Sequence, residues 1–173
     1  MDCCAPKQNS AARLPCPGCG HVGRPVSGVT VEAILDPAHA ARLVDAEPRF
    51  CPTHTCDVLY YGDDGQSAHK QEARVRVGLK ESQDPRPVCY CFGFSRADIV
   101  RELAETGSCT VAPRISAEIK AGHCACETKN PAGSCCLGEV NHEIKASRLR
   151  QAPAARTGSD PVPARSLPDG AHQ

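Results

Sequence analysis

Short apolar runs separated by turn-forming residues make up the first half of the sequence. Residues 29–35 are apolar enough for a strand or the start of a short helix. Residues 56–61, CDVLYY, predict a strand that stops at the turn sequence GDDG. Residues 73–79, ARVRVGL, alternate apolar and basic side chains, which is the pattern of a half-buried strand. Two prolines then stiffen a linker over 84–87, because each proline fixes its own backbone.

The second half has the periodicity of helices. Ser95 is a good N-cap, and Asp98 three residues later completes an approximate capping box. The helix that they begin is expected to end at Gly107. Two further helices are predicted over 113–122 and 135–150, where apolar residues recur at helical spacing.

The chain is poor in large apolar side chains and rich in cysteine. Its 173 residues include six aromatic residues, no tryptophan and 13 cysteines. A chain of this composition gains little stability from burial and needs covalent or metal cross-links. Twelve of the cysteines lie in closely spaced pairs: Cys3-Cys4, Cys16/Cys19, Cys51/Cys56, Cys89/Cys91, Cys124/Cys126 and Cys135-Cys136. Such spacing favours chelation of a metal ion over disulfide cross-linking of distant segments.

The sequence also predicts where the protein works. The first 14 residues, MDCCAPKQNSAARL, contain no apolar run of the kind that an export leader carries. No stretch approaches the roughly 18 apolar residues of a membrane span. We therefore expect a cytoplasmic protein without a membrane span, in a reducing compartment where thiolate–metal bonds persist and disulfides are rare.

Charge and motif content exclude other classes of function. Lys plus Arg and Asp plus Glu each total 20, whereas a nucleic-acid-binding protein normally has a basic excess. No order of Ser, His and Asp, no paired carboxylates and no phosphate-binding loop stands out. We therefore expect neither a nucleic-acid partner nor an enzyme.

Two cysteine pairs in the first half predict a structural zinc site. The sequences CPGC at 16–19 and CPTHTC at 51–56 place two cysteines on each of two turns. Four such sulfurs can surround a zinc ion as a tetrahedron at about 2.3 Å. The predicted ligands are Cys16, Cys19, Cys51 and Cys56. His54 in place of one cysteine, or a set of free thiols or disulfides, are the alternatives.

Cysteines in the second half predict a [2Fe–2S] cluster. The run VCYCFGF at 88–94 places two cysteines just before a predicted helix, whose N-terminal dipole would stabilise an anionic centre. The run HCACETKNPAGSCC at 123–136 is rich in turn-forming residues and again leads into a helix. Four thiolates from two such loops are what a [2Fe–2S] cluster requires. Spacing alone leaves a second zinc site open.

Several motifs resemble the N-terminal part of CopZ-type copper chaperones. The sequences CPGC, FCPTHTCDVLY, RVGLKE, PVCYC and CETKNPAGSCC occur in the same order as in that family, over roughly residues 15–145. The last two also resemble the [2Fe–2S] domain of bacterioferritin-associated ferredoxin (BFD). The resemblance implies that Cys89, Cys91, Cys126 and Cys136 hold the cluster. The choice of Cys126 over Cys124, and of Cys136 over Cys135, stays open.

The expected fold is a small, metal-stabilised α+β protein. A zinc-ribbon-like β module is followed by a helical BFD-like [2Fe–2S] domain and a disordered C-terminal tail. The expected boundaries are 1–14 for a flexible leader, 15–87 for the zinc-binding module and connecting strand, 88–150 for the BFD-like domain, and 151–173 for the tail.

The function implied by the resemblance is that of a metallochaperone-like protein that transfers electrons in the handling of copper or another soft metal. Its partners would be a copper-export ATPase, a separate copper-binding domain or a redox partner. One departure is that no copper-binding domain with a CxxC loop follows residue 150. Cys3-Cys4 is then either a candidate site for a soft metal such as Cu(I) or Hg(II), because thiolates select soft ions, or a pair of solvent-exposed thiols. The alternative is a ferredoxin-like electron carrier with no role in copper handling.

Overall fold

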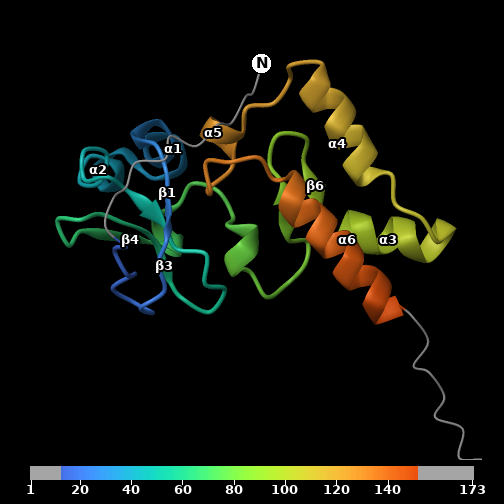
Figure 1. The fold of residues 1–173 in the computed structure, drawn as a ribbon, viewed down its shortest axis with the longest axis horizontal. Helices are drawn as coiled ribbons and strands as arrows, with labels where there is room; N and C mark the ends of the chain where they lie inside the picture. The colour runs from blue at the N-terminus through green and yellow to red at the C-terminus, as the bar shows by residue number, and fades with distance from the viewer. Residues whose placement is uncertain (1–12, 152–173) are drawn as a thin grey trace, which may run out of the picture.

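The computed structural model describes residues 13–151, and an antiparallel sheet with two short helices forms their first half (Figure 1). The sheet has the order β1-β2-β3-β4, in which all neighbours are antiparallel. Its strands are β1 (Arg24–Pro25), β2 (Arg49–Phe50), β3 (Val58–Tyr61) and β4 (Ser67–His69). The helices are α1 (Gly28–Ile34) and α2 (Pro37–Ala40). The strand predicted over 56–61 is β3. Residues 29–34 lie in α1, so the helix, and not the strand, is the alternative that forms over the predicted segment 29–35.

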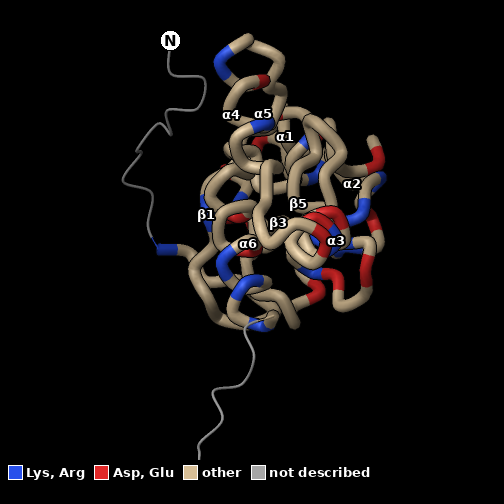
Figure 2. Tube along the Cα trace, turned by 90° about the vertical axis from the view of Figure 1, so that its right-hand side faces the viewer, with Lys and Arg blue, Asp and Glu red and all other residues tan. Residues whose placement is uncertain are grey.

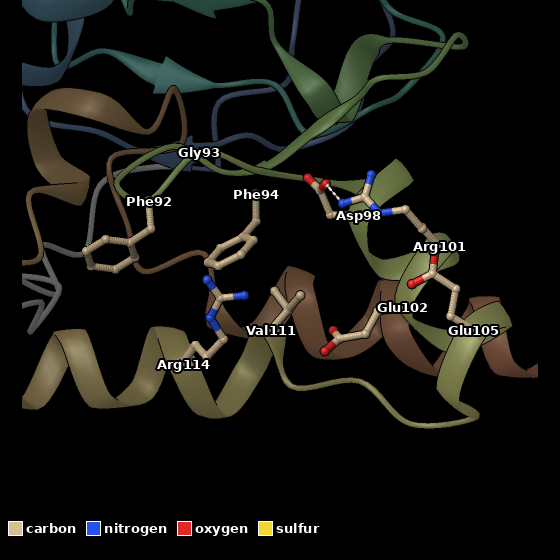
Figure 3. A pocket seen from close by; sticks show the side chains of 9 residues that line it. All are labelled: Phe92, Gly93, Phe94, Asp98, Arg101, Glu102, Glu105, Val111 and Arg114. Carbon is tan, nitrogen blue, oxygen red and sulfur yellow. Dashed lines mark hydrogen bonds and ion pairs between the residues drawn. The ribbon is translucent and has the colours of Figure 1, made fainter.

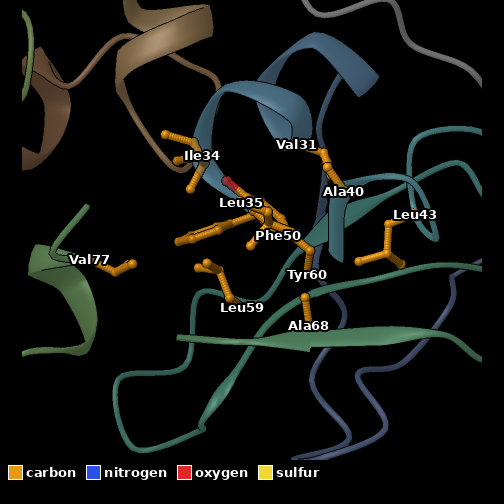
Figure 4. Packing of buried hydrophobic residues seen from close by; sticks show 11 residues of the cluster. Val31, Ile34, Leu35, Ala40, Leu43, Phe50, Leu59, Tyr60, Ala68 and Val77 are labelled. Carbon is orange, nitrogen blue, oxygen red and sulfur yellow. The ribbon is translucent and has the colours of Figure 1, made fainter. Parts of the chain in front are cut away.

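A compact apolar core joins the sheet to these helices. Figure 4 shows side chains from α1 and α2 meeting side chains of β2, β3 and β4. The fully buried members include Val31, Ile34, Leu35, Leu43, Phe50, Leu59 and Tyr60. Because burial of each large apolar side chain contributes about 1.5–3 kcal/mol, this half has more apolar stabilisation than its composition predicts.

The strand predicted over 73–79 is wrong. This segment contains no strand and ends in the 3-10 turn η2 (Gly78–Lys80), which follows a first 3-10 turn, η1 (Lys70–Glu72). Val77 is buried, but Val75 is 37% exposed, so the alternating residues do not share a buried face. Arg74 donates hydrogen bonds to backbone carbonyls of α1, and Arg76 donates to the carbonyls of residues 83 and 85. The basic side chains therefore tie the segment to its neighbours without a β-ladder.

The second half consists of a small hairpin and three longer helices. The hairpin strands are β5 (Pro87–Cys89) and β6 (Phe94–Ser95), and the helices are α3 (Arg96–Thr106), α4 (Val111–Lys120) and α6 (Leu137–Gln151). The predicted capping box is confirmed, since Ser95 and Asp98 bond reciprocally, and Gly107 ends α3 with a φ of 71°. The helices predicted over 113–122 and 135–150 are confirmed as α4 and α6, each with shifted ends. A second apolar core that includes Ile99, Leu103, Val111, Ile115 and Val140 lies between the three helices.

A buried carboxylate network also holds the helical half together. Glu143 in α6 accepts hydrogen bonds from Arg86, Arg96 and Arg150. Arg86 belongs to the linker and Arg96 begins α3, so this one carboxylate ties three segments together. The side chain of Glu143 is only 10% exposed, so removal of one partner of these ion pairs should cost more than removal of a partner from a surface pair.

A short helix from the second half of the sequence docks onto the first half. Helix α5 (Cys126–Lys129) packs against α1, and Figure 1 shows it beside the sheet half. The Thr30 hydroxyl donates to the Glu127 carbonyl at 2.8 Å, and the Tyr60 hydroxyl donates to the Pro131 carbonyl at 2.6 Å. Ala132 joins the core of the sheet half. Helix α5 and the loop after it are therefore supported by the sheet half, including its helix α1.

Charge is mixed over the described part of the chain. Figure 2 shows basic and acidic residues interspersed along the trace. Within residues 13–151, no helix combines the length and apolarity needed to cross a membrane. The predicted leader, apart from residues 13 and 14, and the predicted tail after Gln151 lie outside the described residues, as does Cys3-Cys4.

Candidate metal centres

Four cysteines of the sheet half form the first thiol site, which consists of Cys16, Cys19, Cys51 and Cys56. Their Sγ atoms all lie within 4.8 Å of one another. The Sγ atoms of Cys16 and Cys56 are 3.9 Å apart, and those of Cys19 and Cys51 are 3.7 Å apart. Three of the four residues are buried and Cys19 is half-buried. Four thiols at such separations fit the donor set of a structural zinc site, which has no open position.

The local folding of two turns positions these sulfurs. Cys16 and Cys19 lie in a tight turn in which the Cys16 N–H donates to the His21 carbonyl. Cys51 directly follows β2, and Cys56 comes just before β3, so the hairpin between these strands carries the second pair. The Cys51 N–H donates to the Leu59 carbonyl at 2.9 Å and continues the ladder up to the site.

Electrostatics at the first thiol site favour one preformed thiolate. Hydrogen bonding by the Thr53 hydroxyl, 3.3 Å from the sulfur, lowers the pKa of Cys19 to about 5. Burial raises the pKa of Cys16 to about 12. A cation that binds all four sulfurs therefore meets one anionic thiolate and displaces protons from the more buried thiols.

His54, the alternative ligand, points elsewhere. Its Nδ1 lies 2.6 Å from the Leu79 carbonyl oxygen, which requires that this nitrogen donate the hydrogen bond. His54 is not part of the group of side chains whose ligand atoms converge. The geometry thus favours the four-cysteine set over a set that includes His54.

The second thiol site gathers cysteines from two loops and consists of Cys89, Cys91, Cys124, Cys126 and Cys136. The Sγ atoms of Cys91, Cys124 and Cys126 lie within 4.8 Å of one another. The Cys126 sulfur is 3.5 Å from that of Cys91 and 3.2 Å from that of Cys124. The Cys136 thiol acts on both Cys89 and Cys126, since it is the leading cause of the lowered pKa of each. Cys126 is therefore the thiol that connects the others.

Four different elements bring these sulfurs together. Cys89 ends β5, and Cys91 lies in the turn between β5 and β6. Cys126 begins α5, which is docked on the sheet half, and Cys136 directly precedes α6. The N-terminus of the long helix α6 therefore lies at the site, where its dipole favours negative charge.

The second thiol site also contains acidic thiols. Hydrogen bonding to Cys136 lowers the pKa of Cys89 to about 7 and that of Cys126 to about 5. The same two hydrogen bonds, together with burial, raise the pKa of Cys136. Burial raises the pKa of Cys124 to about 12. Thiolates are the ligands that iron and zinc take, so this cluster of sulfurs is chemically suited to a metal centre.

The sequence left open the choice between Cys135 and Cys136 and the choice between Cys124 and Cys126, and the structure bears on these two choices differently. Cys136 is buried among the other sulfurs, whereas Cys135 is exposed. Cys124 and Cys126 are both close to Cys91, and of these two it is Cys126 whose pKa is lowered chiefly by Cys136. Burial thus distinguishes Cys136 from Cys135, whereas Cys124 and Cys126 both belong to the group of converging sulfurs, which includes neither Cys89 nor Cys136.

A polar hollow of about 460 Å³ lies beside the turn that follows Cys91 (Figure 3). Its lining includes Phe92 and Phe94, and the Arg114 guanidinium lies 4.8 Å from the Phe94 ring centroid. Figure 3 also shows Asp98 paired with a neighbouring arginine of α3. No cysteine is among its lining residues, so the hollow is separate from the second thiol site.

Sequence reasoning missed the residues that support the thiols. Tyr60, Lys80 and Asn130 are buried polar residues that make hydrogen bonds near the two sites, and none belongs to a cysteine motif. Asn130 accepts from the Ala132 N–H and donates to the Ser134 carbonyl, and thereby shapes the loop before Cys136. The dipeptide Asn130-Pro131 carries a turn signal in the sequence, but the other two residues carry none.

Comparisons with known proteins support the interpretation of the first half. Residues 13–74 match the CopZ-type family described as "Zinc binding domain". The chain is 31% identical over 121 residues to "Copper chaperone CopZ" of Archaeoglobus fulgidus, an alignment that covers 70% of this chain and 57% of that protein. The chain thus spans little more than half the length of this relative.

A solved structure extends the comparison beyond the zinc-binding domain. The X-ray structure of the Archaeoglobus fulgidus CopZ N-terminal domain superimposes with a TM-score of 0.62 and 27% identity, over 75% of this chain and 96% of that chain. The resemblance noted from the sequence motifs is therefore confirmed for the zinc-binding domain. Residues 13–74 form a zinc-binding domain of the CopZ type, and the chain is homologous to the N-terminal domain of Archaeoglobus CopZ.

Proposed function

We propose that this chain is a metal-handling accessory protein that holds one structural zinc ion and one [2Fe–2S] cluster. Zinc is assigned to Cys16, Cys19, Cys51 and Cys56. The observation that carries the proposal is that the thiols of the second site come together beside a CopZ-type zinc-binding domain. Such a site offers more than the four thiolates that a [2Fe–2S] cluster needs.

The cluster ligands in this proposal are Cys89, Cys91, Cys126 and Cys136, in a BFD-like arrangement of two loops. When bound, the cluster supplies a one-electron redox couple. Burial of Cys89 and Cys126 limits access of water to the centre, while half-buried Cys91 leaves one side near the surface for electron exchange.

The name of the Archaeoglobus relative supports a role in copper handling. In this role Cys89, Cys91, Cys126 and Cys136 would hold the cluster, which would supply the one electron that converts Cu(II) to Cu(I), with an external electron donor as the source of that electron. Cu(I) would then pass to a copper-export ATPase or a separate copper-binding domain. Cys124 at the site and exposed Cys135 next to it are additional soft ligands for the arriving ion.

Anaerobic purification with metal analysis and a visible spectrum tests the two assignments. We expect one zinc and two irons per chain, and an absorption envelope that dithionite bleaches. A colourless protein after iron reconstitution, with zinc in both thiol sites, would refute the iron–sulfur assignment and leave only the zinc-binding domain.

Equilibrium dialysis separates copper handling from plain electron transfer. Protein already full of zinc and iron should bind Cu(I) stoichiometrically, and the variant Cys124→Ser should bind less of it than wild type. If wild type binds no Cu(I) beyond its two centres, the role in copper handling fails and a ferredoxin-like electron carrier takes its place.

A further inference from the structure

The side chain of Lys80 lies under the first thiol site. Its Nζ donates to the carbonyls of Thr53 at 3.1 Å and Cys56 at 2.8 Å, so it holds the turn that carries Cys51 and Cys56. Lys80 is only 3% exposed, and the ion pairs of the described residues include none with it. A buried ammonium group needs compensating negative charge. A zinc ion with four thiolates has a net negative charge and would provide it.

The same 3-10 turn contacts the second thiol site through its first residue. The Gly78 N–H donates to the hydroxyl of Tyr90 at 2.7 Å, and Tyr90 lies between Cys89 and Cys91. A Cβ atom at Gly78 would lie 1.8 Å from the Pro87 carbonyl oxygen. Only glycine therefore allows the turn to lie against β5, the strand that ends at Cys89.

We propose that η2 couples the occupancy of the two thiol sites, with Lys80 and Tyr90 as positioning residues. This inference rests on the proposed function. Zinc fixes the turn over 51–56, whose carbonyls fix Lys80, and the turn at Gly78 in turn fixes the loop that carries Cys89 and Cys91. Filling the first site with zinc thus raises the affinity of the second site for its cluster. Because such coupling is reciprocal, the bound cluster must strengthen zinc binding by the same factor.

One variant at each end of this connection tests the coupling. Its effect is measured at the metal centre that the substituted residue does not contact. Lys80→Met removes the ammonium group but keeps a long side chain, and the readout is the rate at which the cluster absorbance decays under a fixed chelator. Tyr90→Phe removes only one hydroxyl, and the readout is the apparent zinc affinity in competition with a chromophoric chelator. Lys120→Met is the matched control, because Lys120 is an exposed lysine in α4.

We expect Lys80→Met to accelerate cluster loss and Tyr90→Phe to weaken zinc binding, each by about 5-fold, while Lys120→Met changes neither. In the double variant, the rate of cluster loss and the zinc affinity should each change by less than the sum of the changes in the two single variants, since both substitutions act through one turn. Purely local effects, with Lys80→Met changing only zinc binding and Tyr90→Phe only cluster loss, would overturn the coupling but leave the metal assignments intact. If Lys80→Met does not fold, the zinc affinity of Tyr90→Phe alone decides. Wild-type protein without zinc or iron would overturn both proposals.

Discussion

The two halves of the molecule hold their thiols in different ways. In the sheet half, two turns carry all four sulfurs of the first thiol site, and strands β2 and β3 fix the second turn at both ends. In the helical half, the sulfurs of the second thiol site come from four elements, and one of these, α5, is docked on the other half. The first site is therefore a property of one module, whereas the second depends on how the two halves meet.

The sources of stability differ in the same way. The sheet half combines a core that includes Phe50 and Tyr60 with four converging thiols that could hold a metal ion. The helical half combines a core between α3, α4 and α6 with the ion pairs of Glu143. Loss of zinc and loss of the Glu143 carboxylate should therefore destabilise different halves.

The largest expected effect follows from Cys51→Ser. Cys51 is fully buried, and its loss should reduce zinc from one ion per chain to none, because three thiolates do not close the site. Structural zinc contributes apparent binding free energies of about 10–16 kcal/mol at neutral pH, so the sheet half should lose much of its stability. Hydrogen-exchange mass spectrometry should show faster exchange in β2 and β3 than in α3 and α6.

Cys109→Ser is the control for this experiment. Cys109 is half-buried in the helical half and belongs to neither thiol site. Zinc content and exchange in β2 and β3 should remain as in wild type. Equal acceleration of exchange in both halves of Cys51→Ser would contradict the view that the first thiol site belongs to one module.

Whether a feature could be predicted from the sequence depends on how far apart in the chain its interacting residues lie. The capping box at Ser95 and the pairs of cysteines are local patterns, and local patterns were sufficient to predict them. The alternating run 73–79 does not form a strand because Arg74 bonds to carbonyls of α1, which are distant in sequence, and Arg76 bonds to carbonyls of the following linker. Strands β1 and β2 are two residues long, too short to give a periodic signal.

The supporting polar contacts could not be predicted for the same reason. Lys80 reaches Cys56 across 24 positions and Tyr60 reaches Pro131 across 71. Nothing in the local sequence around either residue marks such a partner. Cysteine spacing thus indicates which sulfurs are candidate ligands, but tertiary packing decides which loops bring those sulfurs together.

A smaller effect is expected from Glu143→Gln, which tests the helical half. Loss of the carboxylate removes the ion pairs of Arg86, Arg96 and Arg150 with Glu143, and removal of one member of a buried ion pair typically costs 3–5 kcal/mol. We expect about 3 kcal/mol in urea unfolding at neutral pH, since the arginines are partly exposed. Exchange should increase in α3 and α6 and remain slow in β2 and β3. Glu139→Gln removes a single partly exposed ion pair, that with Arg24, in the same helix and should alter stability by no more than about 1 kcal/mol.

The effect of Glu143→Gln should also depend on pH. Burial raises the pKa of Glu143, but the hydrogen bonds from Arg150 and Ser147 outweigh it and the net pKa is lowered. A carboxyl group with a lowered pKa in the folded state stabilises the protein above its unfolded pKa of about 4.3. This contribution is lost as pH falls through the folded pKa. The difference in stability between wild type and Glu143→Gln should therefore shrink below about pH 4, and a constant difference would contradict the ion-pair account.

The smallest effect concerns the contact between the halves and is tested by Tyr60→Phe. The Tyr60 side chain is fully buried, and burial raises its pKa, so the hydroxyl stays protonated and donates to the buried Pro131 carbonyl. The variant leaves this carbonyl without its donor, at a cost of about 1–3 kcal/mol. We expect that loss in urea unfolding, together with faster exchange over 126–133.

Tyr61→Phe separates docking from general destabilisation. Tyr61 is equally buried, but its hydroxyl bonds to the backbone of Gly23 and Leu14, both within the sheet half. Its loss should cost a similar free energy without faster exchange over 126–133. If both variants accelerate exchange over 126–133 equally, α5 is not held by the Tyr60 contact. The position of α5, and with it that of Cys126, would then depend on its contacts with α1, such as the hydrogen bond from the Thr30 hydroxyl to the Glu127 carbonyl.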